Sequence, residues 1–401
     1  HVDKYANYYN SDSGWAIPYP HIAEVGLSCG SNGTYDQQGN AAEWVEDSNR
    51  EGWKLALGGS LIRPSQYTLC GITEGDDPNK PISTFGFRVC QSPDTSIRKQ
   101  VHEPYFPASG TSLGTNGTCR TDCQGSKYVL ISDIGNKGDC INQYRGAVYY
   151  QFYLSRTELS NAQYCIFLNS VATKSDPFHL YSENMGNSVC GGIIRHEING
   201  SYHYECIEGW AKRPVVYISF YSLARYANWM HFGCPNTGQS EFGTTEGDDK
   251  QGAYDTRDFE DVRNGAKKVY ENFGKRNTGA KFWIPNEDEW YKAAYYDPTI
   301  IGHRKYHDYP TGSDTPPSKE QANYVINNEL SVGPPYFVAE VDDFSNAPSY
   351  YGTLQQGGNV WEWIESWQYG NVGCRGLKGG SWSYTAFGLN AINTDPGGID
   401  D

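Results

Sequence analysis

The sequence contains no long apolar run. None of its 401 residues lies in a stretch approaching the roughly 18 consecutive apolar residues that a membrane-spanning helix needs. Basic residues are also scarce, since 32 Lys and Arg face 47 Asp and Glu and leave a formal net charge of -15. A surface of that sign repels a phosphate backbone. We therefore expect no membrane span and no nucleic-acid partner.

Common catalytic motifs are missing as well. The chain has no HExxH zinc-protease motif and no GxxxxGK[ST] phosphate loop. Its nine histidines are scattered along the chain, and an isolated His is more often a hydrogen-bonded structural group than a base or a metal ligand. We assign no catalytic role to any of them.

Methionine is nearly absent, with two residues, whereas the chain has 32 Tyr, 11 Trp, 15 Phe and 45 Gly. Aromatic rings bury large apolar areas, and glycine favours turns and loops. This composition predicts a core packed by rings and much irregular structure between short elements.

Eleven cysteines are present without the paired CxxC spacing of a zinc site, and the closest two are Cys119 and Cys123. We therefore predict disulfides, and with them a secreted, extracellular protein. The odd number leaves at least one thiol free or bonded outside this sequence. Three N-x-S/T sequons with a central Gly, at Asn32, Asn116 and Asn199, predict glycosylation on exposed turns.

An internal repeat organises the chain. Residues 35–60 read YDQQGNAAEWVEDSNREGWKLALGGS, and residues 353–381 read TLQQGGNVWEWIESWQYGNVGCRGLKGGS. Gly39 aligns with Gly358, and Glu43 aligns with Glu362. One unit therefore recurs after about 320 residues.

The two copies end at different points. Copy one continues to the alternating run FGFRV at 85–89, which predicts a buried strand, whereas copy two stops before its own version of that strand. We infer three parts: 1–92, the C-terminal part of one domain; 93–126, a Ser, Thr, Gly and Pro-rich linker held by Cys119 and Cys123; and 127–401, a second domain lacking its last strand.

Local signals predict three helices in the second domain. One has Ser160 as its N-cap, another begins near Ser219, and the third begins at a capping-box pair, Asn286 with Glu289. Apolar residues follow each start at helical spacing, which is typical of helices that pack on a core.

Two further disulfides are predicted from position. The segment GGIIRHEINGSYHYEC at 191–206 reads as a hairpin that turns at Asn199 and Gly200, which would bring Cys190 close to Cys206. Cys70 has Cys90 as its expected mate, at the end of the FGFRV strand.

Five motifs occur in one order: TELSNAQYCIFLN, RPVVYISFYSLARYANWM, FWIPNEDEWYKAAYY, GGNVWEWIE and GGSWS. This set resembles the formylglycine-generating enzyme (sulfatase-modifying factor) family over 127–401. Residues 1–92 resemble the C-terminal third of a second such domain. The resemblance implies an α+β fold, a variant of the C-type lectin fold with much irregular structure, present as one partial and one nearly complete copy.

Oxidase members of that family carry two cysteines shortly after the GGS motif, where thiolates bind copper and the substrate thiol. Tyr384 and Leu389 stand at those positions in copy two, and Arg63 and Thr68 stand there in copy one. The resemblance therefore implies a domain that binds no copper and is not an enzyme.

The family also holds a structural calcium ion around its G-N-x-x-E-W segment, through hard oxygen donors. Carried over by position, the expected ligands are Gln355, Gly358, Val360 and Glu362 in copy two, and Asp36, Gly39, Ala41 and Glu43 in copy one. The alternative is that each Glu carboxylate caps a turn or pairs with an Arg.

We expect a secreted structural protein whose domains are strung in tandem or assemble head to tail, as in an extracellular filament or surface layer. A domain without its last strand leaves backbone groups unpaired, so later sequence or another copy of the protein must fill the gap by strand complementation. Two alternatives are an extracellular lectin-like module that binds a ligand or glycan, and, disfavoured by Tyr384 and Leu389, an oxidase acting on a sulfatase cysteine.

Overall fold

A computed structural model describes the backbone of residues 43–48, 54–57, 85–88, 90–91, 120–187, 189–270, 272–367 and 374–393. The chain forms two compact units, His1–Gly75 and Asp76–Asp401. The division therefore falls before the FGFRV segment and not at residue 92, because that segment pairs with strands of the second unit.

The first unit contains an antiparallel hairpin of β1 (Glu43–Ser48) and β2 (Lys54–Leu57). In the second unit, β13 (Trp361–Trp367) pairs with β14 (Arg375–Lys378) in the same way. Glu43 lies opposite Leu57 as Glu362 lies opposite Lys378. Within each hairpin, the residues that correspond in the repeat are therefore paired in the same register.

Two sheets organise the second unit. The five-stranded sheet has the order β10-β4-β7-β6-β5, and the three-stranded sheet has the order β14-β13-β3. The new strands are β3 (Phe85–Phe87), β4 (Cys90–Gln91), β5 (Arg120–Thr121), β6 (Lys127–Ile131), β7 (Phe152–Ser155) and β10 (Phe282–Trp283). All of them are short, as expected of a fold rich in loops.

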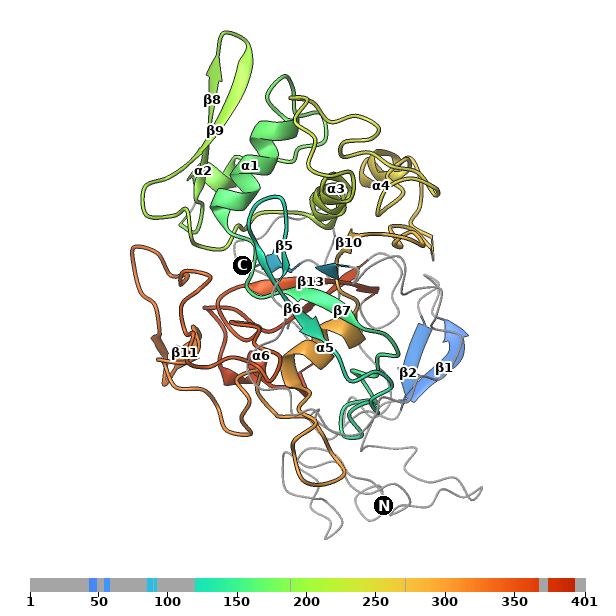
Figure 1. Ribbon diagram of the computed structural model, residues 1–401, viewed down its shortest axis with the longest axis vertical. Helices are drawn as coiled ribbons and strands as arrows, with labels where there is room; N and C mark the ends of the chain where they lie inside the picture. Colours follow the sequence, from blue (N-terminus) through green and yellow to red (C-terminus); the bar gives the residue numbers. More distant parts are fainter. Residues whose placement is uncertain are drawn as a thin grey trace. The chain divides into compact units, whose positions relative to one another are not determined.

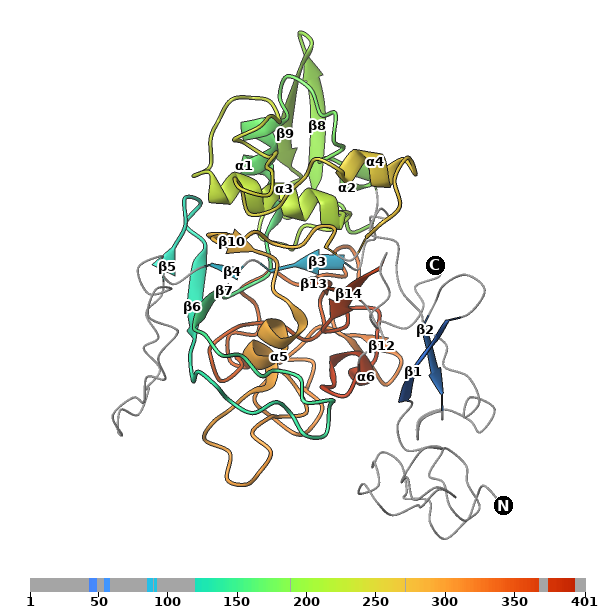
Figure 2. The same ribbon diagram turned by 90° about the vertical axis from the view of Figure 1, so that its right-hand side faces the viewer.

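Strand β3 occupies the place that the sequence predicts to be vacant. It runs parallel to β13, with Phe85 opposite Trp361 and Phe87 opposite Trp363, and β4 continues from it between β10 and β7 (Figure 2). In this structure the strand beside β13 therefore comes from an earlier part of the same chain.

The three predicted helices are present, as α1 (Asn161–Val171), α3 (Phe220–His231) and α5 (Glu287–Tyr295). The predicted N-caps Ser160, Ser219 and Asn286 each accept a hydrogen bond from a backbone N–H in the first turn. Helices α1 and α3 lie on one side of the strands and α5 lies on the other (Figures 1 and 2). Short helices are α2 (Asn184–Asn187), α4 (Phe259–Arg263) and α6 (Ala386–Leu389).

The predicted hairpin is formed by β8 (Ile193–Ile198) and β9 (Ser201–Cys206), and it projects beside α1 (Figure 1). Asn199 and Gly200 both have positive φ at its turn, a conformation that suits Asn and Gly. A second small hairpin joins β11 (Val325–Ile326) to β12 (Glu329–Leu330).

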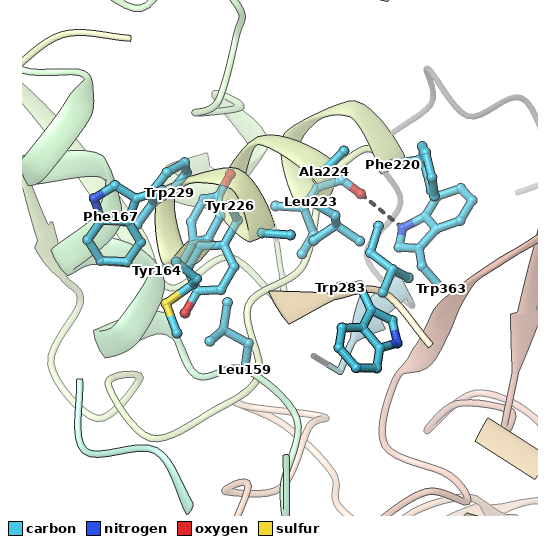
Figure 3. Packing of buried hydrophobic residues seen from close by; sticks show 14 of the residues in the cluster. Leu159, Tyr164, Phe167, Phe220, Leu223, Ala224, Tyr226, Trp229, Trp283 and Trp363 are labelled. Atoms are coloured by element: carbon cyan, nitrogen blue, oxygen red, sulfur yellow. Dashed lines mark hydrogen bonds between the residues drawn. The ribbon is translucent and has the colours of Figure 1, made fainter. Parts of the chain in front are cut away.

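Aromatic rings fill the core between the helices and the strands. Phe167 on α1 packs against Tyr226 and Trp229 on α3, with ring centroids 5.2 and 5.3 Å apart (Figure 3). Trp283 and Trp363 extend this cluster toward the sheets. The prediction of a core packed by aromatic rings, made from the composition, is therefore confirmed. Among the described residues, no helix is both long and apolar enough to cross a membrane.

Candidate functional site

A buried ion pair lies where β3 meets β13. The Arg88 Nε donates to both carboxylate oxygens of Glu362, at 2.7 and 2.6 Å, and both side chains are fully buried. Trp290 Nε1, from α5, donates to the same carboxylate at 2.7 Å. Burial raises the pKa of the Glu362 carboxyl, and Arg88 and Trp290 oppose that shift.

The remaining donors of Arg88 bind three carbonyl oxygens. Nη1 donates to the carbonyls of Ser155 and Arg156 at 3.3 and 3.0 Å, and Nη2 donates to the carbonyl of Leu354. One guanidinium therefore joins β3 to β13, to the end of β7 and to the loop before β13. The planar fork of Arg suits this task, since Lys offers only a single point charge.

A second carboxyl, Glu158, lies close to this pair. It accepts a hydrogen bond from Asn359 Nδ2 at 2.9 Å, and burial followed by the negative charge of Glu362 raises its pKa to about 8. Asn359 has a positive φ of 60° and also accepts from Ala339 N and Asn323 Nδ2, so it is held on both sides. Burial beside Glu362 therefore favours the protonated form of Glu158.

Glu158 also lines a small pocket with Tyr128, Thr157 and Gln163. A protonated carboxyl at a pocket wall is able to act as a general acid. The residues that line the pocket include no His and no Cys. The pocket therefore offers hydroxyl, amide, ammonium and carboxyl groups.

Two of the calcium ligands expected around Glu362 donate hydrogen bonds through their nitrogen atoms, which are not the atoms that would bind the ion. Gln355 Nε2 donates to the Glu340 carbonyl at 2.6 Å, and the Gly358 N–H donates to the Gly379 carbonyl at 2.9 Å. Val360 is buried in an apolar cluster. Gln355 Oε1 is buried without a hydrogen-bond partner among the described residues, which leaves one hard oxygen available.

The single carboxylate of that set does not suit calcium. Its two oxygens already face the Arg88 guanidinium, whose positive charge would repel a second cation at the same place. Glu362 therefore follows the Arg-pairing alternative, and we assign no calcium ion to it. Within the described ranges, no three His, Cys, Asp or Glu side chains are grouped to hold a metal.

The copy-one ligand positions Asp36, Gly39 and Ala41, like Arg63 and Thr68, lie outside the described residues. Glu43 is the first residue of β1 and pairs with Leu57 through the backbone. The sequons at Asn32 and Asn116 also lie outside the described part. Asn199 is exposed at the tip of the β8–β9 hairpin, as the sequon predicts.

The positions of the family's cysteine pair are packed. The Tyr384 ring contacts Trp361 edge to face, with centroids 5.0 Å apart, and Leu389 is fully buried in a small apolar cluster. The Tyr384 carbonyl accepts from the Val325 N–H at 2.7 Å. These two side chains stabilise the loop after the GGS motif, and neither provides a thiolate.

The disulfide predictions need correction. Cys123 bonds to Cys234 and so is not bonded to Cys119, which lies outside the described residues. Cys190 and Cys206 are separate thiols, because Cys206 lies opposite Ile193 in the hairpin and its side chain meets Cys165 on α1.

Cys90 is a buried free thiol at the start of β4, and Cys70, its expected mate, lies outside the described residues. The Cys90 side chain is fully buried, and this desolvation raises the pKa of its thiol well above the ordinary value. Such a thiol reacts poorly while the protein is folded, which is typical of a cysteine that packs in a core.

Sequence reasoning missed a second buried charge cluster. Arg276 Nη1 donates to both oxygens of Glu289, at 2.9 and 3.0 Å, and its Nε lies 3.5 Å from Glu365. Trp283 Nε1 donates to Glu289 at 3.2 Å. Glu289 was predicted as a capping residue, and it does cap α5, but its partner Arg276 lies in an irregular loop that carries no local signal.

Comparison with known proteins shows a match to one family and a similarity to one solved structure. The sequence model of the "Sulfatase-modifying factor enzyme 1-like domain" matches residues 144–395, more than half of the chain. Among solved structures, a chain described as Treponema denticola variable protein 1 is similar at 16% identity and a TM-score of 0.37, covering 69% of this chain and 92% of that one. No curated protein matches.

Proposed function

Because the chain belongs to the sulfatase-modifying factor enzyme 1-like domain family, we propose a role for it in which the family's fold is kept and its oxidation chemistry is lost. The protein is a non-catalytic, extracellular structural protein that assembles with copies of itself. The observation that carries the proposal is the packing of Tyr384 and Leu389 at the positions where the family's oxidases hold their thiols. Fold alone does not imply activity, because activity depends on the site.

Two features support an extracellular setting. The Cys123–Cys234 disulfide links two segments that are separated by 111 residues, and such bonds persist in oxidising compartments. Asn199 presents a sequon on an exposed hairpin turn, where a glycan meets no packed neighbour.

A thiol-oxidation assay tests the loss of catalysis. The purified chain, loaded with copper, is incubated with a sulfatase-type cysteine peptide and dioxygen, beside an active family oxidase as the positive control. We expect no aldehyde product above the peptide-only background by mass spectrometry. Turnover by this chain would overturn the proposal.

Electron microscopy of the native protein tests assembly. We expect regular filaments or a layer with a repeat of about one domain diameter, since heterologous contacts propagate when their rotation does not close. Particles that remain single at all concentrations would contradict the assembling role and would leave the absence of catalysis untouched.

A second candidate function has one specific observation in its favour. The loop 132–150 exposes four apolar side chains: Ile134, Ile141, Tyr144 and Tyr149. Its base is held by buried contacts, since Asp139 pairs with Arg304 at 3.0 Å and Asn136 Nδ2 donates to Tyr306 at 2.7 Å. Exposed rings on a rigid loop favour ligand or glycan recognition.

Glycan-array binding tests this candidate. We expect a binding module to retain specific glycans as a monomer and to lose them when Tyr144 and Tyr149 are both replaced by Ala. Tyr270, another exposed ring on a different loop, provides the matched control substitution. Identical array profiles for all three proteins would remove this loop as a binding surface.

A further inference from the structure

Residues Phe85–Gln91 complete a domain to which they are not adjacent in sequence. Strand β3 adds to β13, and β4 inserts between β10 and β7. If this segment were withdrawn, β13 would lose a neighbour and β10 would lose its strand partner. Unpaired backbone groups in a sheet are costly, so the position must be filled. We call this place beside β13 and between β7 and β10 the acceptor position.

The acceptor position is chemically specific. Glu362 is fully buried there and needs a cation, and the Ser155, Arg156 and Leu354 carbonyls accept from the same guanidinium. A strand that fits must therefore place an Arg one residue after the position opposite Trp363. Phe85–Gln91 of this chain has that pattern.

The tether between the segment and its acceptor is long. Residues 92–119 separate Gln91 from Arg120, and at roughly 3.3 Å per residue that length of chain spans on the order of 90 Å when extended. The same contacts are therefore within reach of the chain's own acceptor position and of one in a neighbouring molecule. Exchange of identical elements is a low-cost route to assembly, because no new contact has to be created.

We infer that Phe85–Gln91 is an exchangeable donor strand, which a second copy of this chain supplies to the acceptor position. In the exchanged form the partner contributes Arg88 to Glu362, in place of the Arg88 that the chain otherwise supplies to itself. This inference rests on the proposed self-assembly and names its contact.

The opposing pair Cys90 and Leu154 allows a covalent test. Directly opposed residues of antiparallel strands have Cα atoms about 4.5–5.5 Å apart, which lies within the Cα separation that a disulfide can bridge. An acceptor chain carrying Cys90→Ser and Leu154→Cys is refolded together with a differently tagged wild-type donor chain, with glutathione disulfide as the oxidant. Only a donor strand from the other molecule brings Cys90 to the new thiol.

We expect a covalent heterodimer at least tenfold above the level in a control whose acceptor carries Cys90→Ser alone. Peptide mass spectrometry is expected to join the Cys90 peptide of the donor to the residue-154 peptide of the acceptor. Heterodimer at the control level, while Leu154→Cys in a chain that retains Cys90 closes its own bond, would overturn the inference. Absence of both bonds would overturn it too, because the β4–β7 register would then be wrong.

A second measurement covers the case in which Leu154→Cys does not fold. Tagged and untagged wild-type chains are refolded together, and capture of the untagged chain is measured with an excess of a synthetic peptide of residues 83–93. We expect the peptide to reduce capture at least fivefold, and a peptide with Arg88→Ala to leave it unchanged. Capture that ignores both peptides, or no capture at all, would contradict the exchange.

These outcomes separate the inference from the proposed function. Filaments without the heterodimer bond would keep the assembling role and place its contact on another surface. A heterodimer bond in a chain that oxidises a thiol peptide would keep the exchange and remove the non-catalytic role.

Discussion

Arg88 and Glu362 are two buried charges that each require the other. Removing one member of such a pair leaves an uncompensated charge in the core and costs about 3–5 kcal/mol. We therefore expect Arg88→Ala to lower the free energy of unfolding by that amount, as measured by urea titration. Arg257→Ala serves as the control, because its pairs with Asp249 and Asp255 are exposed, and it is expected to leave the midpoint unchanged. Equal midpoints for both variants would show that the buried pair does not hold the strand.

Glu158 makes stability depend on pH in a direction opposite to that of an ordinary surface acid. Its pKa of about 8 in the folded protein lies above the unfolded value, so the folded state retains a proton that the unfolded state loses. The contribution of Glu158 to the free energy of unfolding is fully present below the unfolded pKa and is lost as the pH rises toward 8. Between these two pKa values, the free energy of unfolding falls by up to about 1.4 kcal/mol per pH unit.

Glu158→Gln isolates this effect. The amide still accepts a hydrogen bond from Asn359 but does not titrate. From pH 5 to pH 8 we therefore expect the wild type to lose stability relative to the variant. Urea midpoints across that range provide the measurement. A constant difference would mean that Glu158 is ionised throughout.

Cys165 and Cys206 are positioned to form a disulfide that the sequence did not suggest. The two thiols are hydrogen-bonded to each other, which lowers the pKa of Cys206 and raises that of Cys165. The Cys206 thiolate is therefore the expected nucleophile; with glutathione disulfide as the oxidant, the two thiols lose two protons and two electrons to form the S–S bond.

We predict a Cys165–Cys206 cross-linked peptide pair in protein prepared under non-reducing conditions, detected by mass spectrometry. Cys190, buried and predicted at first to bond to Cys206, is the control and should stay alkylatable after denaturation. Recovery of a Cys190–Cys206 pair would restore the original expectation.

At the scale of single elements, helix caps offer a matched comparison. Ser160 accepts from the Gln163 N–H at the start of α1, whereas Thr385, at the start of α6, has similar backbone angles and makes no side-chain cap bond. Ser160→Ala should destabilise the protein by about 1 kcal/mol, and Thr385→Ala by much less. Thermal unfolding of the two variants tests the difference, and similar losses would show that the cap bond is not the cause.

The elements that the sequence predicted well are those with local signals. Ser160, Ser219 and Asn286 mark helix starts within a few residues, and Asn199 with Gly200 marks a turn, because caps and turns are decided by neighbours in the chain. The Cys190–Cys206 pairing failed at the same hairpin. The register of the hairpin does not indicate that the Cys206 side chain contacts Cys165 on α1.

The pairing of β3 with β13 was beyond local reasoning. Parallel strands are not joined by a tight turn, so nothing in the sequence of either strand indicates its partner. Arg88 was a usable signal nonetheless. An Arg within a buried strand requires a buried acid, and Glu362 was already a residue for which pairing with an Arg was one of the expected roles.

At the scale of the whole molecule, the second unit closes through a segment that precedes it in sequence. Arg88 and Glu362 are 274 residues apart, yet their contact joins both sheets of the unit. The connection through 92–119 is thus not what holds the donor strand in place. Backbone pairing and the buried pair do so, and they persist whether the strand belongs to the same chain or to another.

Cutting the chain between donor and acceptor tests that view. A protease site placed within 108–115 leaves a donor fragment and an acceptor fragment without a peptide link. In reducing buffer we expect the two to elute together in size exclusion, because strand pairing and the buried guanidinium hold them. With Arg88→Ala the fragments should separate on cleavage, while the uncut variant elutes as one chain. Separation of the wild-type fragments would mean that the tether, rather than the paired strand, completes the fold.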